Sequence, residues 1–132
     1  MKELAVIIDI KTQFLTERSF AEDNRFIWSY EVTIKNNGDA TIQLLNRYWR
    51  ITEQNDHVEE VRGSGVVGLQ PVIKPGRQFT YTSYCQLTTP QGSMEGYYEM
   101  QTLDEEIFLV KIPLFLLASP ILSTVSHGSQ LH

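Results

Sequence analysis

Hydrophobic and polar residues alternate with a period of two along much of this chain. Between residues 25 and 35 the even positions carry Phe, Trp, Tyr, Val and Ile, and the odd positions carry mainly polar residues. Successive side chains of a strand point to opposite faces of its sheet. The segment is therefore predicted to be a strand with one buried and one solvated face.

The same alternation returns in segments separated by turn-forming residues. It predicts further strands over residues 4–14, 41–53, 79–84, 94–101 and 107–112, with turns at 36–39, 54–56 and 103–106. Residues 4–14 are expected to form an edge strand that could accept another strand. In residues 41–53, Leu45, Trp49 and Ile51 are expected to share one face. A clear helical period is missing, so the pattern predicts an all-β sandwich of about seven or eight short strands.

Length and composition fit a single globular domain. The chain has 132 residues, of which 42% are hydrophobic and 20% charged, and this leaves room for one core. We expect the domain to span residues 1–122 and the polar residues 123–132 to form a frayed tail.

Charge and cysteine content restrict the partner and the compartment. A formal net charge of -5 argues against a surface that neutralises nucleic-acid phosphates. The single cysteine, Cys85, cannot form an internal disulfide, which favours a reducing compartment such as the cytoplasm. A signal peptide and an apolar run of the ~20 residues that span a bilayer are not recognisable, so no membrane span is expected.

The sequence Gly-Ser-Gly-Val-Val-Gly at residues 63–68 has the spacing of a phosphate-binding glycine motif. Pro71 and Pro75 follow too closely for the helix that such a motif needs, so a connection between strands is the favoured interpretation. The alternative is a site for phosphate, pyrophosphate or a nucleotide, and it remains open. Its candidate residues are Arg62, Gly63, Ser64, Gly65 and Gly68. A Gly65→Val change is expected to damage binding or folding, because valine tolerates positive φ poorly.

Catalytic and metal-binding patterns are not apparent. His57, His127 and His132 lie far apart in the sequence, and nothing orients a base toward Cys85. We therefore predict neither an enzyme nor a bound metal or cofactor.

Adjacent aromatic residues provide candidate contacts for a protein partner. The pairs Tyr48–Trp49 and Tyr97–Tyr98 each lie in a predicted strand, so the two rings of a pair must point to opposite faces. A ring exposed beside Arg47 or Arg50 would suit a protein interface. The candidate contacts are Tyr48, Trp49 and Tyr97.

Several segments resemble the ApaG family, in order and over nearly the whole chain. They are residues 36–39, 48–52, 59–71, 74–76, 79–83, 89–98 and 112–115, of which 61–71 is the most specific. The chain departs from the family pattern at Tyr48, where a histidine usually precedes the tryptophan.

The resemblance implies a fibronectin type III-like, immunoglobulin-like antiparallel β-sandwich. It also implies an association with cobalt and magnesium resistance or efflux, and a role in protein contacts, because the domain recurs in larger eukaryotic proteins. The resulting expectation is a non-enzymatic binding module with a protein partner. A homodimer through edge strands is a further expectation.

Overall fold

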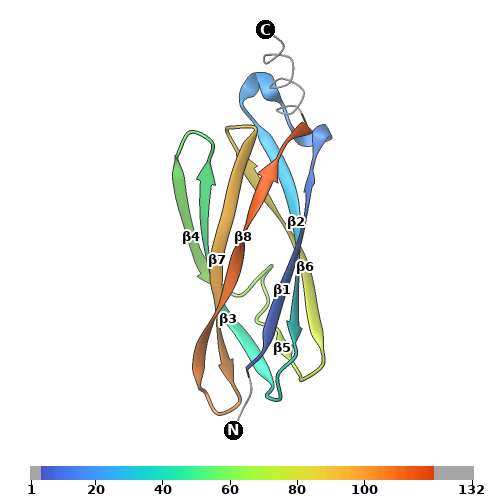
Figure 1. The fold of residues 1–132 in the computed structure, drawn as a ribbon, viewed down its shortest axis with the longest axis vertical. Helices are drawn as coiled ribbons and strands as arrows, with labels where there is room; N and C mark the ends of the chain where they lie inside the picture. The colour runs from blue at the N-terminus through green and yellow to red at the C-terminus, as the bar shows by residue number, and fades with distance from the viewer. Residues whose placement is uncertain (1–3, 121–132) are drawn as a thin grey trace.

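The computed structural model describes residues 4–120, and over this range the chain is built almost entirely of antiparallel strands (Figure 1). Its strands are β1 (Val6–Phe14), β2 (Phe26–Asn36), β3 (Ile42–Glu53), β4 (Val58–Ser64), β5 (Val72–Ile73), β6 (Gln78–Leu87), β7 (Gln91–Thr102) and β8 (Ile107–Ala118). Two short 3-10 helices, Thr16–Arg18 and Ala21–Asp23, connect β1 to β2. The predicted all-β class is confirmed.

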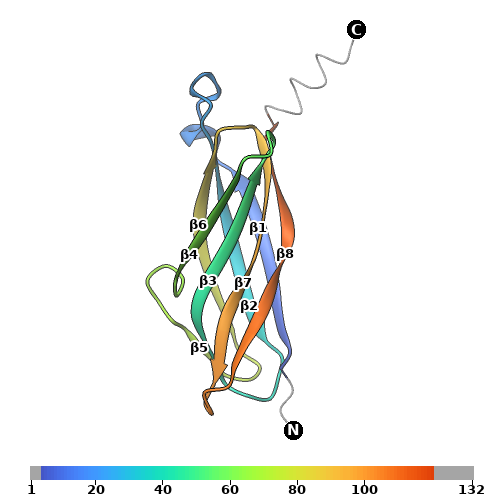
Figure 2. The ribbon, with the colours of Figure 1, turned by 90° about the vertical axis from the view of Figure 1, so that its left-hand side faces the viewer.

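The strands form two sheets that face each other in an elongated sandwich (Figures 1 and 2). The smaller sheet has the order β1-β2-β6, and the larger has β4-β3-β7-β8, with β5 pairing the beginning of β3. Every pairing is antiparallel. This arrangement agrees with the expected fibronectin type III-like and immunoglobulin-like sandwich. The first strand, β1, lies at an edge of the smaller sheet, as predicted.

The core lies between the two sheets and is built from alternate residues of each strand. Every even-numbered residue of β2 is buried, so the first strand prediction is confirmed. Trp28 on β2 is fully buried, and its indole nitrogen donates to the Ala118 carbonyl oxygen at 2.9 Å, which connects the two sheets. Tyr81 on β6 and Tyr98 on β7 share a buried hydrogen bond between their hydroxyls. Both polar tips are thus satisfied inside an apolar core.

Two features of the larger sheet correct the sequence prediction. A β-bulge between Leu44 and Asn46 shifts the alternation of β3, so Leu44 is buried on the face that Trp49 shares, and Leu45 lies at the bulge instead. The last strand continues through Pro113 to Ala118 instead of ending at residue 112. Proline is tolerated there because β8 is an edge strand whose outer side lacks a ladder partner.

The predicted domain end at residue 122 and the tail 123–132 lie outside the described residues. Over residues 4–120, no helix has the length and apolar character needed to cross a membrane.

Candidate functional site

The glycine-rich segment leaves the larger sheet after β4 and returns to it at β5. Figure 2 shows this loop at the side of the sandwich, next to β4. At its tip, Val66 and Leu69 exchange two backbone hydrogen bonds, of 2.8 and 2.9 Å. The residues between them, Val67 and Gly68, have φ values of 44° and 78°. Positive φ at both central positions is the signature of a type I′ turn, so the segment is a tight hairpin and not the start of a helix.

The backbone amides of this loop are largely engaged within the protein. The Gly65 amide donates to the Leu45 carbonyl oxygen at 2.8 Å, at the position of the β3 bulge. The amides of Val66 and Leu69 donate across the turn. A phosphate cradle needs several free amides that converge on one point. Three of the loop amides therefore cannot serve a phosphate without losing a hydrogen bond in the fold.

Gly63 provides room for an arginine of the neighbouring strand. It pairs with Arg47 of β3, and a Cβ on Gly63 would lie 2.8 Å from the guanidinium carbon. The Arg47 Nη1 atom donates to the carbonyl oxygens of Ser64 and Gly65, both at 3.0 Å. The glycine spacing of the motif thus serves the packing of Arg47 and the turn beyond it.

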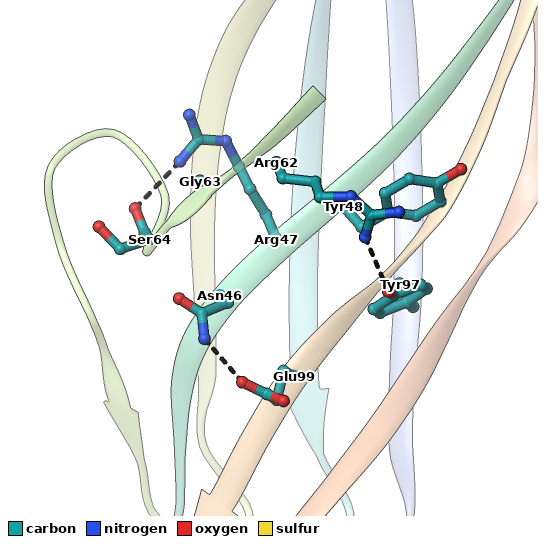
Figure 3. Close-up of a pocket in the computed structure, with 8 residues that line it drawn as sticks. All are labelled: Asn46, Arg47, Tyr48, Arg62, Gly63, Ser64, Tyr97 and Glu99. Carbon is teal, nitrogen blue, oxygen red and sulfur yellow. Dashed lines mark hydrogen bonds between the residues drawn. The ribbon is translucent and has the colours of Figure 1, made fainter. Parts of the chain in front are cut away.

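The outer face of the larger sheet carries a compact group of aromatic and charged side chains (Figure 3). The rings of Tyr48 on β3 and Tyr97 on β7 are stacked, with their centroids 4.9 Å apart. The Arg62 guanidinium from β4 lies 4.3 Å from the Tyr48 ring centroid and donates to the Tyr97 hydroxyl at 3.2 Å. We call Tyr48, Arg62 and Tyr97 the tyrosine face. Direct pairing of Tyr48 with both Arg62 and Tyr97 across the three strands brings these residues together.

One acidic residue, Glu60, contacts two of the three side chains of the tyrosine face. The Tyr48 hydroxyl donates to Glu60 at 2.6 Å, and this hydrogen bond to the carboxylate raises the pKa of Tyr48. Glu60 also lies 3.8 Å from Arg62. Beside them, the Asn46 amide donates to Glu99 at 2.6 Å. Contacts within the protein therefore restrict the three side chains of the tyrosine face.

Strand alternation separates the residues proposed from the sequence into two groups. Tyr48, Arg62 and Tyr97 lie on the outer face, whereas Gly63 and Gly65 belong to the loop and its strand. Trp49 is 3% exposed and packs in the core, which removes it from the candidate partner contacts. Arg47 was not among the proposed site residues. The sequence offers one sign of it: Arg47 is a charged residue two positions before Trp49, where the alternation predicts a core residue.

Cys85 is a buried thiol whose environment disfavours the thiolate. It is 6% exposed, and burial, together with the negative charges of Glu59 and Glu53, raises its pKa to about 12. Only the thiolate reacts rapidly with thiol reagents. Over residues 4–120 there is also no group of three or more His, Cys, Asp or Glu side chains that could hold a metal ion.

Cys85 is expected to be protected from thiol reagents in the folded protein and to label rapidly in denaturant. Because its folded pKa lies above that of an unfolded cysteine, near 8.5, the folded state binds the proton more tightly. This contribution to stability is complete below about pH 8.5 and is lost as the pH rises toward 12. Ellman's reagent with and without urea at pH 8 measures the protection. Equal labelling rates in the two conditions would contradict it.

The fold and the sequence can be compared with known proteins. A family model described as the ApaG domain matches residues 16–102. Protein ApaG of Agrobacterium fabrum is 48% identical over 124 residues, which cover 94% of both chains. Protein ApaG of Beijerinckia indica is 50% identical over 113 residues, 86% of this chain and 87% of the relative. The crystal structure of a Bordetella pertussis protein described as ApaA superposes with a TM-score of 0.86 at 38% identity, covering 89% of this chain and 95% of that one.

Proposed function

The chain belongs to the ApaG domain family, and on that premise we propose that it is a non-enzymatic binding module for a protein partner. The observation that carries the proposal is the tyrosine face on the outer surface of the larger sheet. Tyrosine and arginine are enriched among the residues that dominate protein–protein binding energy. Stacking and hydrogen bonding already restrict these side chains, so binding a partner would cost less conformational entropy.

The surroundings of the tyrosine face suit a protein interface. Next to Tyr97 on β8 lies Lys111, and Leu109 beyond it pairs with Glu99. The Leu109 side chain is 61% exposed. An interface typically has an apolar and aromatic centre within a polar rim. The tyrosines with Leu109 would form the centre, and Glu60, Glu99 and Lys111 the rim.

We propose that the family's association with cobalt and magnesium resistance acts through such a partner. Carboxylate, imidazole and thiolate groups would have to converge for direct binding of these cations. The described residues offer no such group of three. The module would then influence cation handling without coordinating the metal itself.

Loss of the tyrosine face is expected to weaken partner binding without unfolding the domain. A Tyr48→Ser, Tyr97→Ser double variant removes both half-buried rings of this face, and Thr80→Ala on the outer face of the opposite sheet is the matched control. Proteins retained by the immobilised wild-type domain are identified, and the binding of the purified partner is then measured for all three forms. We expect the double variant to bind at least about tenfold more weakly and the control to bind normally. Equal binding by all forms would exclude this face.

A second copy of the chain is an alternative partner, through an edge strand. The edge strand β8 exposes Leu109, Leu114 and Leu116, which are 61%, 53% and 64% exposed. Exposed apolar edges favour pairing with another strand. Light scattering over a range of protein concentrations would show a dimer mass if this pairing occurs.

A further inference from the structure

A small notch opens between the two sheets, where the glycine-rich loop meets the smaller sheet. Its volume is about 210 Å³. One wall consists of loop residues 66–68, and the other carries the side chains of Tyr30, Tyr81 and Ser83. Arg47 also lines it. The notch contains none of the three residues of the tyrosine face, although Arg47 lines the pockets at both places.

Arg47 brings to this notch a positive charge that has no ion-pair partner among residues 4–120. Within residues 4–120, the ion pairs join other residues, Lys35 with Asp9 and Arg62 with Glu60. The two hydrogen bonds of Arg47 both come from Nη1 and go to carbonyl oxygens. A guanidinium has five N–H donors in a planar fork. Within the described residues, the Nε and Nη2 donors of Arg47 thus have no hydrogen-bond acceptor, and its charge is not paired.

Hydroxyl groups lie close to this charge. Tyr30 and Ser83 pair directly across β2 and β6, so the two residues lie side by side. Burial raises the pKa of Tyr30, and the neighbouring Ser83 acts in the opposite direction. Burial raises the pKa of Tyr81 as well, and the positive charge of Arg47 lies close enough to both tyrosines to oppose that rise. Each hydroxyl can donate one hydrogen bond and accept others, so the hydroxyls of Ser83 and Tyr30 can donate to an incoming oxygen atom.

We propose that this notch binds a small oxyanion, a phosphate or carboxylate group, with Arg47 as its charged ligand and the hydroxyls of Ser83 and Tyr30 as further donors. Arginine pairs with such groups through two parallel hydrogen bonds. The volume lies below the roughly 300–1,000 Å³ of sites for drug-sized molecules, so it suits one anionic group and not a whole nucleotide. The glycine-rich loop contributes a wall and orients Arg47, and its amides remain in the turn.

Titration with sodium phosphate and with sodium acetate, followed by amide NMR at constant ionic strength, tests the proposal. We expect saturable shifts confined to the loop tip and to Ser83, with chloride producing none. The Arg47→Gln variant should bind at least about tenfold more weakly. Arg50→Gln, an exposed arginine of the same strand, is the matched control and should bind as the wild type does.

Because Arg47 also holds two loop carbonyls, a Ser83→Ala variant provides an independent test. It removes a ligand-facing hydroxyl without touching those contacts, and it should weaken binding severalfold while leaving the amide spectrum of the free protein otherwise unchanged. Shifts with phosphate alone would identify a phosphate site, and shifts with both anions a general oxyanion site. Saturable binding of neither anion, or equal loss in Arg47→Gln and Arg50→Gln, would overturn the proposal.

Discussion

Replacing Gly96 with alanine is expected to lower the free energy of unfolding by about 3 kcal/mol or more, or to prevent folding. Gly96 lies on β7, where it pairs directly with Trp49 of β3. A Cβ at this position would overlap the carbonyl oxygen of Tyr48 and would lie 3.1 Å from the Trp49 Cα atom. The overlap is with backbone between two central strands, so relief requires the sheet itself to move. Urea unfolding followed by tryptophan fluorescence measures the change.

Gly76→Ala is the control, because it replaces a glycine without creating a steric overlap. Gly76 has a φ of 79°, and a Cβ there would meet nothing within 4 Å. Gly76→Ala should therefore cost only the roughly 1–2 kcal/mol of placing alanine in a left-handed conformation. If Gly96→Ala is as stable as the wild type, the close approach of β3 to β7 described here is wrong.

The strands themselves could be predicted because burial on one face leaves a direct trace in the sequence. The alternation in β2 predicts its buried face completely. In β7, Met94, Tyr98 and Met100 are buried on the predicted face, at 1%, 0% and 0% exposure. A slip of one residue would turn these large side chains to solvent, so the hydrophobic pattern fixes the register.

The departures from regular strands could not be predicted from that pattern. A bulge adds one residue to a strand, so the residues beyond it point to the opposite face from the one that alternation predicts. Because Leu44 and Leu45 are both apolar, the sequence does not show which of them faces the core. Similarly, a proline would interrupt a central strand but is tolerated in an edge strand, as Pro113 is in β8. Which strand becomes an edge depends on how distant segments pair, and alternation does not carry that information.

The site was predictable only in part, for a related reason. Alternation requires one ring of each adjacent aromatic pair to leave the core, and Tyr48 and Tyr97 are the ones that do. These two rings stack on each other beside Arg62 because β4, β3 and β7 pair side by side. That pairing joins segments far apart in the sequence, so the local pattern does not predict it. The glycine motif misleads for the opposite reason. Its spacing matches a phosphate loop, but the structure uses Gly63 to admit Arg47 and Gly68 to complete a turn.

Replacing Gly65 with alanine is expected to destabilise the domain by about 3 kcal/mol or more, and valine by at least as much. Gly65 has a φ of 63°, which a residue with a Cβ adopts at a cost of about 1–2 kcal/mol. A Cβ would also overlap the Leu69 carbonyl oxygen, which accepts the Val66 amide in the turn. The substitution thus combines backbone strain with the loss of a turn hydrogen bond. Thermal and urea unfolding would both report it.

Gly68→Ala separates these two causes. Its φ of 78° is similar, but a Cβ at residue 68 would meet nothing within 4 Å, so only the conformational cost of about 1–2 kcal/mol remains. A clearly larger effect at residue 65 would mean that the close contact with Leu69 holds the loop against β3. Because the Gly65 carbonyl oxygen also accepts from Arg47, that variant should in addition release the guanidinium. Equal effects of the two substitutions would show that the loop tolerates displacement, and that its glycines serve only the turn.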